Sequence, residues 1–127
     1  MNRTRICTAL LFLLAAASAA ADRQAVLSHY AAAAESIPSA ERGRSLWNKP
    51  GIRGRDCSQC HGQDLRRPGR HQRTRKPIKP MAPSVNPKRL TDLKQVEKWF
   101  RRNCKWTWGR ECTAREKADI LQWLDTL

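Results

Sequence analysis

Three side chains near the middle of the chain have types and spacing that suit one kind of chemistry. Cys57 and Cys60 stand three residues apart, and His61 follows at once. Two thiols at this spacing can add to the two vinyl groups of one porphyrin, and the adjacent imidazole then lies under the iron. A different gap would misplace one sulfur, and a displaced histidine would miss the metal. The pentapeptide therefore predicts covalent attachment of one haem c, with His61 as the proximal iron ligand.

Two other interpretations of the same pentapeptide stay open. A Cys-x-x-Cys pair can be half of a zinc site, whose second half would have to come from Cys104 and Cys112. The seven residues between these two cysteines make a wider gap than a usual second zinc knuckle. A redox-active dithiol expects a βαβ context, and the sequence contains no strand pattern. Haem attachment fits the residues better than either alternative.

The first 21 residues have the pattern of a secretory signal peptide. Arg3 and Arg5 form a basic start, residues 6–17 form a short apolar run, and small residues precede Asp22. The apolar run is too short to span a bilayer comfortably, and nothing later is long enough. We therefore expect cleavage before Asp22 and an exported, periplasmic protein that is not an integral membrane protein.

The mature chain, residues 22–127, is expected to form one domain. It keeps four cysteines, of which two go to haem and two remain, Cys104 and Cys112. An exported protein can hold a disulfide. Closing a loop of this size would stabilise the fold by about 2–3 kcal/mol on the chain-entropy model.

The chain is strongly basic, with a formal net charge of +14 that becomes +12 once Arg3 and Arg5 are removed. Such a charge steers a protein towards acidic surfaces. Nucleic acid is the usual partner of a chain this basic, but an exported protein rarely meets it. An acidic redox partner or anionic lipid headgroups fit better, and a generally solvated basic surface is the simpler alternative.

Helical periodicity and capping signals predict an all-α domain built around the haem. The helices are expected at residues 22–36, 40–47, 92–104 after an N-cap at Thr91, and 114–127 after the capping box that starts at Thr113. The section from Leu65 to Pro87 contains five prolines and many arginines, so it is expected to be irregular. Its arginines could pair with the haem propionates, although the sequence selects none of them.

Residues 41–47 resemble the N-terminal helix of class I c-type cytochromes, in which a glycine and an aromatic residue pack on the C-terminal helix. Here these are Gly43 and Trp47, with Trp123 as the expected partner. A narrower resemblance, over most of the mature chain, is to the sphaeroides haem protein group of single-haem cytochromes. The segments that carry it are residues 40–44, 57–62, 82–84, 96–99, 102–104, 109–112 and 116–119.

The resemblance to this group implies that Asn103 is an unusual distal ligand of ferric iron, which lets go on reduction. It also implies a disulfide between Cys104 and Cys112 beside this ligand. Oxygen, nitric oxide or carbon monoxide could then bind, with electrons supplied by another cytochrome. A neutral amide is a weak iron ligand, and Asn103 lies between the last two predicted helices, where class I cytochromes present the distal ligand. Trp106 and Trp108 are the expected walls on that side.

Met81 is the rival distal ligand. Residues 79–83 resemble the proline-flanked methionine loop of ordinary electron carriers, which would give His61 and Met81 as axial ligands. His71, in the basic section, is a weaker alternative. An enzyme that reduces oxygen or another small oxidant at an open iron site ranks below both carriers, because the sequence supplies no obvious acid or base.

Overall fold

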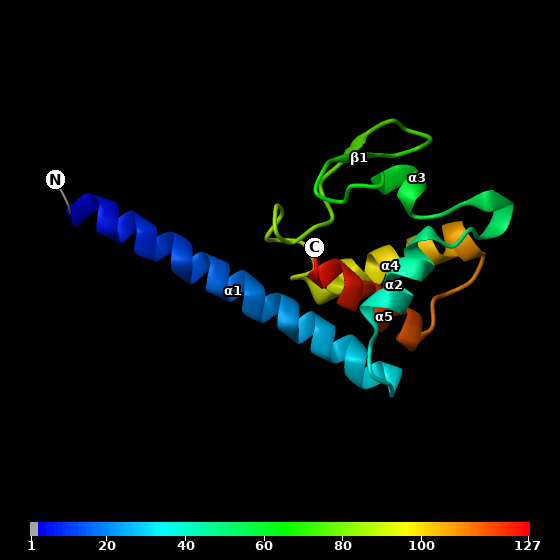
Figure 1. Ribbon diagram of the computed structural model, residues 1–127, viewed down its shortest axis with the longest axis horizontal. Coiled ribbons are helices and arrows are strands. Elements are labelled where there is room, and N and C mark those ends of the chain that lie inside the picture. Colours follow the sequence, from blue (N-terminus) through cyan, green and yellow to red (C-terminus); the bar gives the residue numbers. More distant parts are fainter. Residues whose placement is uncertain (1–2) are drawn as a thin grey trace.

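The computed structural model describes the backbone of residues 3–127 and the side chains of residues 15–127. The fold is helical, as predicted, and α5 lies against both α1 and α2 (Figure 1). The turn α3 and a short hairpin lie together at one end of the molecule. The elements in order are α1 (Arg3–Ala34), α2 (Ala40–Asn48), the 3-10 turn η1 (Ile52–Gly54), α3 (Ser58–His61), β1 (Gly69–Arg70), β2 (Pro77–Ile78), α4 (Leu93–Trp108) and α5 (Ala114–Asp125).

The last helix forms as its capping signal predicts. The Thr113 hydroxyl accepts a hydrogen bond from the Glu116 amide, and the Glu116 carboxylate accepts one from the Thr113 amide. The helix buries Ile120, Leu121 and Leu124, so its apolar face forms much of the core.

Helices α2 and α5 cross at a glycine. A Cβ on Gly43 would lie 2.0 Å from the carbonyl oxygen of Asp119, so only hydrogen fits between the two backbones. One turn later, the rings of Trp47 and Trp123 pack edge to face with centroids 5.5 Å apart. The packing expected from the resemblance to class I cytochromes is therefore confirmed.

Helix α1 covers most of the predicted helix 22–36 but ends two residues earlier, at Ala34. It also begins much earlier than predicted, and its N-terminal half projects away from the other helices (Figure 1). Among its described side chains, Val26, Leu27 and Tyr30 are buried in the core, and Ala34 packs against it. Residues 1–2 and the side chains of residues 3–14, including Cys7, lie outside what the structure describes, so cleavage before Asp22 stays a prediction. None of the described helices combines the length and apolar character needed to cross a bilayer.

Helix α4 differs from its prediction at both ends. Its N-cap is Asp92, whose carboxylate accepts from the Gln95 amide, and Thr91 is not the cap. The helix continues past Cys104 to Trp108 and ends where Gly109 adopts a left-handed φ of 71°. The predicted end at Cys104 was wrong because the glycine stop comes five residues later. Asn103 consequently lies within the helix and not between two helices.

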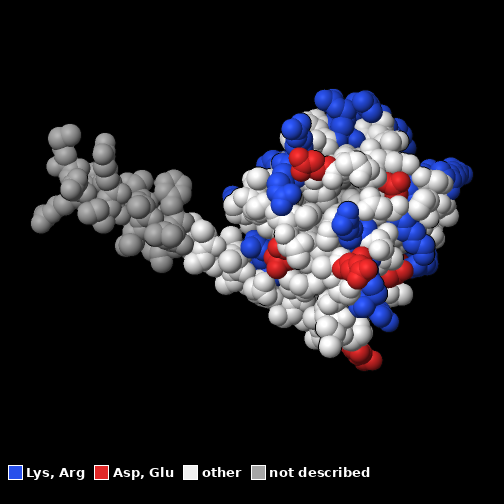
Figure 2. All heavy atoms as spheres, viewed as in Figure 1, with Lys and Arg blue, Asp and Glu red and all other residues white. Residues whose placement is uncertain are grey.

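The proline-rich section is mostly irregular, as expected, but it contains one small antiparallel ladder that the sequence analysis did not predict. Gly69 pairs with Ile78 and Arg70 with Pro77. The turn between the strands is closed by His71, whose Nδ1 accepts from the amides of Arg73 and Thr74. Basic side chains cluster at this end of the molecule (Figure 2).

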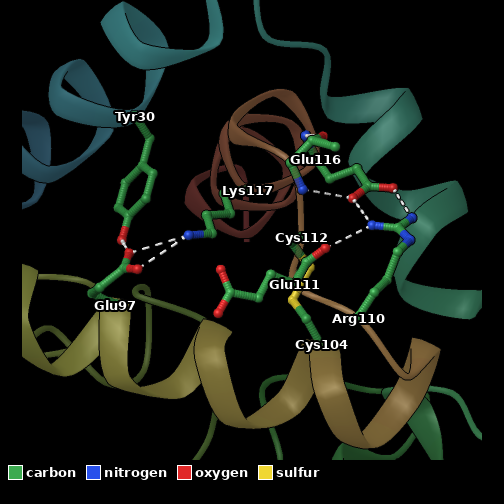
Figure 3. The surroundings of a disulfide bond; sticks show 9 residues. Tyr30, Glu97, Cys104, Arg110, Glu111, Cys112, Glu116 and Lys117 are labelled. Carbon is green, nitrogen blue, oxygen red and sulfur yellow. Dashed lines mark hydrogen bonds and ion pairs between the residues drawn. A yellow bond between two sulfur atoms is a disulfide. The ribbon is translucent and has the colours of Figure 1, made fainter.

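A polar network links the N-terminal half of α4 to two other helices (Figure 3). The Tyr30 hydroxyl donates to the Glu97 carboxylate at 2.6 Å, and the Lys117 ammonium donates to the same carboxylate at 3.1 Å. These bonds join α1, α4 and α5. Burial and the neighbouring carboxylate raise the pKa of Tyr30, so the phenol remains a donor at any physiological pH.

Candidate haem-binding site

The motif residues occupy a single helical turn. The Asp56 carboxylate accepts from the Gln59 amide at 3.1 Å, and this bond starts α3 in the manner of an N-cap. The amides of Cys60 and His61 both donate to the Cys57 carbonyl, at 3.3 and 3.2 Å. In a helical turn, residues three and four apart lie on one face. The structure therefore brings the two thiols and the imidazole together on one side of α3.

Cys57 and Cys60 are free thiols, and both are partly buried. Burial, with added repulsion from Asp56 and Cys60, raises the pKa of Cys57 to about 12, although the Thr107 hydroxyl opposes the shift. A redox-active dithiol needs a thiol whose pKa is lowered. The environment of Cys57 therefore argues against a redox-active dithiol.

A zinc site would also need a second pair of ligands. Cys104 and Cys112 are joined in a disulfide with Cα atoms 5.6 Å apart, so they are not free to bind metal (Figure 3). This is the disulfide that the resemblance implies. It links α4 to the start of α5 immediately after Asn103.

The imidazole of His61 is held in its neutral form. Burial and, to a smaller extent, the positive charge of Arg89 lower the pKa of His61 to about 4. Its ring lies 5.1 Å from that of Trp47, whose carbonyl accepts from the Cys57 amide at 3.2 Å. A neutral imidazole is the form that ligates iron. Helix α2 therefore positions the proximal side of the site.

Asn103 is exposed on α4, in the middle of a face that carries two tryptophans. Trp99 lies four residues before it and Trp106 three residues after it, so the three side chains share one face. Each ring is covered by a guanidinium 4.7 Å from its centroid, Arg89 over Trp99 and Arg55 over Trp106. The sequence analysis preferred Trp106 and Trp108 to Trp99, although the helical spacing of Trp99 from Asn103 places these two residues on one face.

Trp108 does not share this face, because it follows Asn103 by five residues. Its ring packs so closely on Gly51 that a Cβ there would lie 2.5 Å from the indole. Of the two tryptophans expected as walls, only Trp106 therefore shares a face of α4 with Asn103, and the second tryptophan on that face is Trp99.

The two other candidate ligands have different surroundings. Met81 is 7% exposed and belongs to the main hydrophobic cluster, with its amide donating to the Leu65 carbonyl at 3.0 Å. His71 is exposed, and its Nδ1 is already used in closing the hairpin turn. Of the two, only Met81 is buried close to the elements that hold His61.

The residues present fit a haem. Two free thiols and a neutral imidazole lie on one face of α3, which is the donor set that covalent attachment and proximal ligation require. The indole nitrogens of Trp47 and Trp108 are buried without an acceptor among the described residues. Buried donors rarely stay unpaired, and the propionates of a haem are acceptors.

Comparison with known proteins also indicates a haem protein. Residues 33–124 match the family model described as "Domain of unknown function (DUF1924)". The chain is 47% identical over 103 residues to cytochrome c-type protein SHP of Cereibacter sphaeroides, covering 78% of this chain and 79% of that protein.

Two solved structures are similar as well. Oxidized SHP, described as an oxygen-binding cytochrome c, superposes with a TM-score of 0.77 at 44% identity, covering 83% of this chain and 96% of that one. The solution structure of Methylophilus methylotrophus cytochrome c'' superposes with a TM-score of 0.71 at 30% identity, covering 84% and 94%. The chain therefore belongs to the SHP-like family of c-type cytochromes, whose cofactor is a covalently bound haem c.

Proposed function

We propose that this protein is an exported single-haem cytochrome that accepts electrons and binds small diatomic ligands when reduced. In this proposal Cys57 and Cys60 hold the haem, His61 is the proximal ligand, and Asn103 is a weak, displaceable distal ligand. The observation that carries it is the exposed amide of Asn103, which lies between Trp99 and Trp106 on one face of α4.

The chain's own groups explain why such a site would exchange ligands. A haem supplies one-electron chemistry and two axial positions. His61 is a strong donor because its imidazole is held neutral and oriented against Trp47. Asn103 offers only a neutral amide oxygen, a hard donor that suits ferric iron and holds ferrous iron poorly. Asn103 therefore leaves its position more easily than a thioether or a second imidazole would.

The disulfide favours one way in which the proposed distal ligand would leave its position. Cys104 follows Asn103 directly and is tied to Cys112, so the α4 backbone is restrained beside the ligand. Release of Asn103 would then be a side-chain movement that needs no unwinding of the helix. The face between the two tryptophans would leave room for oxygen, nitric oxide or carbon monoxide.

The relatives agree with this proposal. SHP is described as an oxygen-binding cytochrome c. The cytochrome c'' structure is described as giving insight into haem-ligand detachment. Both descriptions match an iron site whose distal ligand can be displaced.

The test compares Asn103→Ala with Met81→Ala in the purified haem protein. Replacing Asn103 is expected to change the ferric absorption and electron spin resonance spectra, because the sixth ligand is lost. Replacing Met81 is expected to leave both spectra unchanged. The reduced wild-type protein is expected to bind carbon monoxide readily. A low-spin spectrum that depends on Met81 and not on Asn103 would overturn the proposal.

An ordinary electron carrier is the second candidate function, and one observation favours it. Arg89, whose charge acts on His61, donates a hydrogen bond to the carbonyl of Pro80, the residue before Met81. Met81 is therefore buried in the neighbourhood of the proximal ligand, where a thioether could serve as the sixth donor. The same pair of variants decides between the two candidates.

Export and an acidic redox partner complete the proposal. The leader pattern of residues 1–21 supports secretion, and covalent haem attachment is an extracytoplasmic process. The β1–β2 hairpin, whose basic side chains are exposed, packs on α3, with a Cβ on Gly69 reaching within 2.3 Å of the Cys60 carbonyl. A partner with an acidic surface would thus dock beside the haem-bearing turn.

A further inference from the structure

One buried positive charge near the site has no carboxylate partner among the residues that the structure describes. Arg89 is only 7% exposed. It takes part in none of the ion pairs between described residues. A guanidinium removed from water costs free energy unless an anion compensates it. The burial of Arg89 therefore calls for an anion that the described residues do not supply.

The side chain is nevertheless held in one orientation. Its Nε donates to the Pro80 carbonyl at 3.0 Å, and its Nη2 donates to the Lys79 carbonyl at 2.7 Å. Its guanidinium plane covers Trp99 with Cζ 4.7 Å from the ring centroid. Neutral carbonyls and an aromatic face fix the direction of the group but do not neutralise its charge.

Arg89 also lies beside the helix that carries the proposed distal ligand. Trp99, which its guanidinium covers, lies one helical turn before Asn103 on α4. An anion that pairs with Arg89 would therefore lie close to the face of α4 that carries Asn103.

We propose that Arg89 binds a propionate carboxylate of the haem and thereby positions the macrocycle between α3 and α4. This inference rests on the proposed haem attachment at Cys57 and Cys60. A guanidinium forks onto a carboxylate with two parallel hydrogen bonds, and the haem is the one source of carboxylate that the site requires. The sequence analysis placed such a partner among the arginines of residues 65–87, but all of those are exposed.

The experiment uses the haem-loaded protein with Arg89→Met, which keeps the length and apolar packing without the charge, and with Arg89→Lys, which keeps the charge without the fork. Resonance Raman spectroscopy reports the propionate bending vibration. The band is expected to shift in both variants. The midpoint potential is expected to fall in Arg89→Met, which removes a positive charge near the iron, and to change less in Arg89→Lys.

Arg110→Met is the matched control, because Arg110 also faces a tryptophan, at 5.7 Å, but is already paired with Glu116 at 2.7 Å. It is expected to leave the propionate band and the potential unchanged. An unshifted band in Arg89→Lys would overturn the inference, and this variant decides the matter if Arg89→Met does not accumulate. Failure of the wild-type chain to attach haem would instead overturn the proposed function.

Discussion

At the scale of single residues, the site combines one strong and one weak candidate ligand in very different surroundings. His61 is kept neutral by burial and by Arg89, and its ring is oriented by Trp47. Asn103 is exposed and has tryptophans on either side along its helix face. This asymmetry follows from where each residue lies. His61 is in a turn packed against α2, whereas Asn103 is in the middle of a helix face on which Trp106 is still 38% exposed.

The tryptophans on that face are expected to control access to the iron. Replacing Trp106 by Leu removes an aromatic wall and is expected to raise the association rate of carbon monoxide with the reduced protein roughly tenfold, equivalent to about 1.4 kcal/mol. Flash photolysis measures this rate. Trp108→Leu is the control, because Trp108 is on a different face of α4. Equal rates in the two variants would contradict the assignment of this face to the distal side.

The carboxyl group of Asp119 is expected to make the stability of the protein depend on pH. Burial alone would raise the pKa of Asp119, but hydrogen bonds from Arg42 and from the Ser39 amide outweigh it and hold the pKa below its ordinary value. A carboxyl group whose folded pKa is lowered stabilises the protein above its unfolded pKa of about 3.9, and this contribution is lost as pH falls through the folded value.

Wild type is therefore expected to melt roughly 5–10 °C above Asp119→Asn at pH 6, a difference that narrows as the pH approaches 2. Circular dichroism melts of the haem-loaded protein between pH 6 and pH 2 measure it. Melting curves that stay the same distance apart over this range would show that the carboxylate contributes nothing through its charge.

At the scale of elements, the crossing of α2 and α5 fixes the platform on which the proximal side rests. Gly43 allows the two backbones to touch, and Trp47 then reaches both Trp123 and His61. Without this close approach the ring of Trp47 would move away from the imidazole. The glycine therefore acts on the iron site through one intervening side chain.

Gly43→Ala is expected to destabilise the protein by about 1–3 kcal/mol, because the added methyl group overlaps the Asp119 carbonyl. Helix propensity alone would predict the opposite sign, with a gain of about 1 kcal/mol. Denaturant unfolding of the ferric protein measures the change. Ser45→Ala, at an exposed position of the same helix, is the control and is expected to be nearly neutral. A higher free energy of unfolding in Gly43→Ala than in wild type would contradict the close crossing of α2 and α5.

The helical fold, the capping box and the Gly43–Trp47–Trp123 contact were predictable because each depends on residues close in sequence or on a family pattern. The end of α4 was misplaced because Gly109, a recognisable stop, was given less weight than the basic residues before Cys104. The β1–β2 pairing depends on bonds between segments rich in proline, which carry no periodic signal.

The special role of Arg89 was not predictable in this way. Lys88 and Arg89 are adjacent basic residues, and the sequence does not distinguish them. Only the tertiary fold buries Arg89 over Trp99 and leaves Lys88 exposed. Which of two adjacent basic residues becomes buried depends on the tertiary fold, and no local sequence pattern indicates it.

At the scale of the whole molecule, basic charge is gathered at the end that carries the site. The formal charge is +14, and the exposed arginines and lysines of the hairpin lie beside α3 (Figure 2). A field of this sign attracts an acidic protein over distances of about a Debye length. Encounter complexes are therefore expected to form with the haem-bearing turn facing the partner.

The rate of reduction by an acidic cytochrome is expected to fall at least tenfold between low and physiological ionic strength. Stopped-flow absorbance measures it. Reversing the charge of Arg73 and Arg75 to Glu is expected to slow the reaction further, whereas the same reversal at Lys94 and Arg101 on α4 is expected to have a smaller effect. Equal losses from both pairs would mean that net charge alone steers the encounter.

The ion pair between Arg23 and Asp125, at 2.7 Å, brings the start of the expected mature chain next to its last helix. Cleavage at the predicted site before Asp22 would place the new N-terminus beside the last residues of α5. A few flexible residues would suffice to splice them into a closed backbone, and a new opening could be cut at the exposed turn of residues 73–74. Conversely, bulky tags fused to both ends at once would crowd each other against the same helix pair.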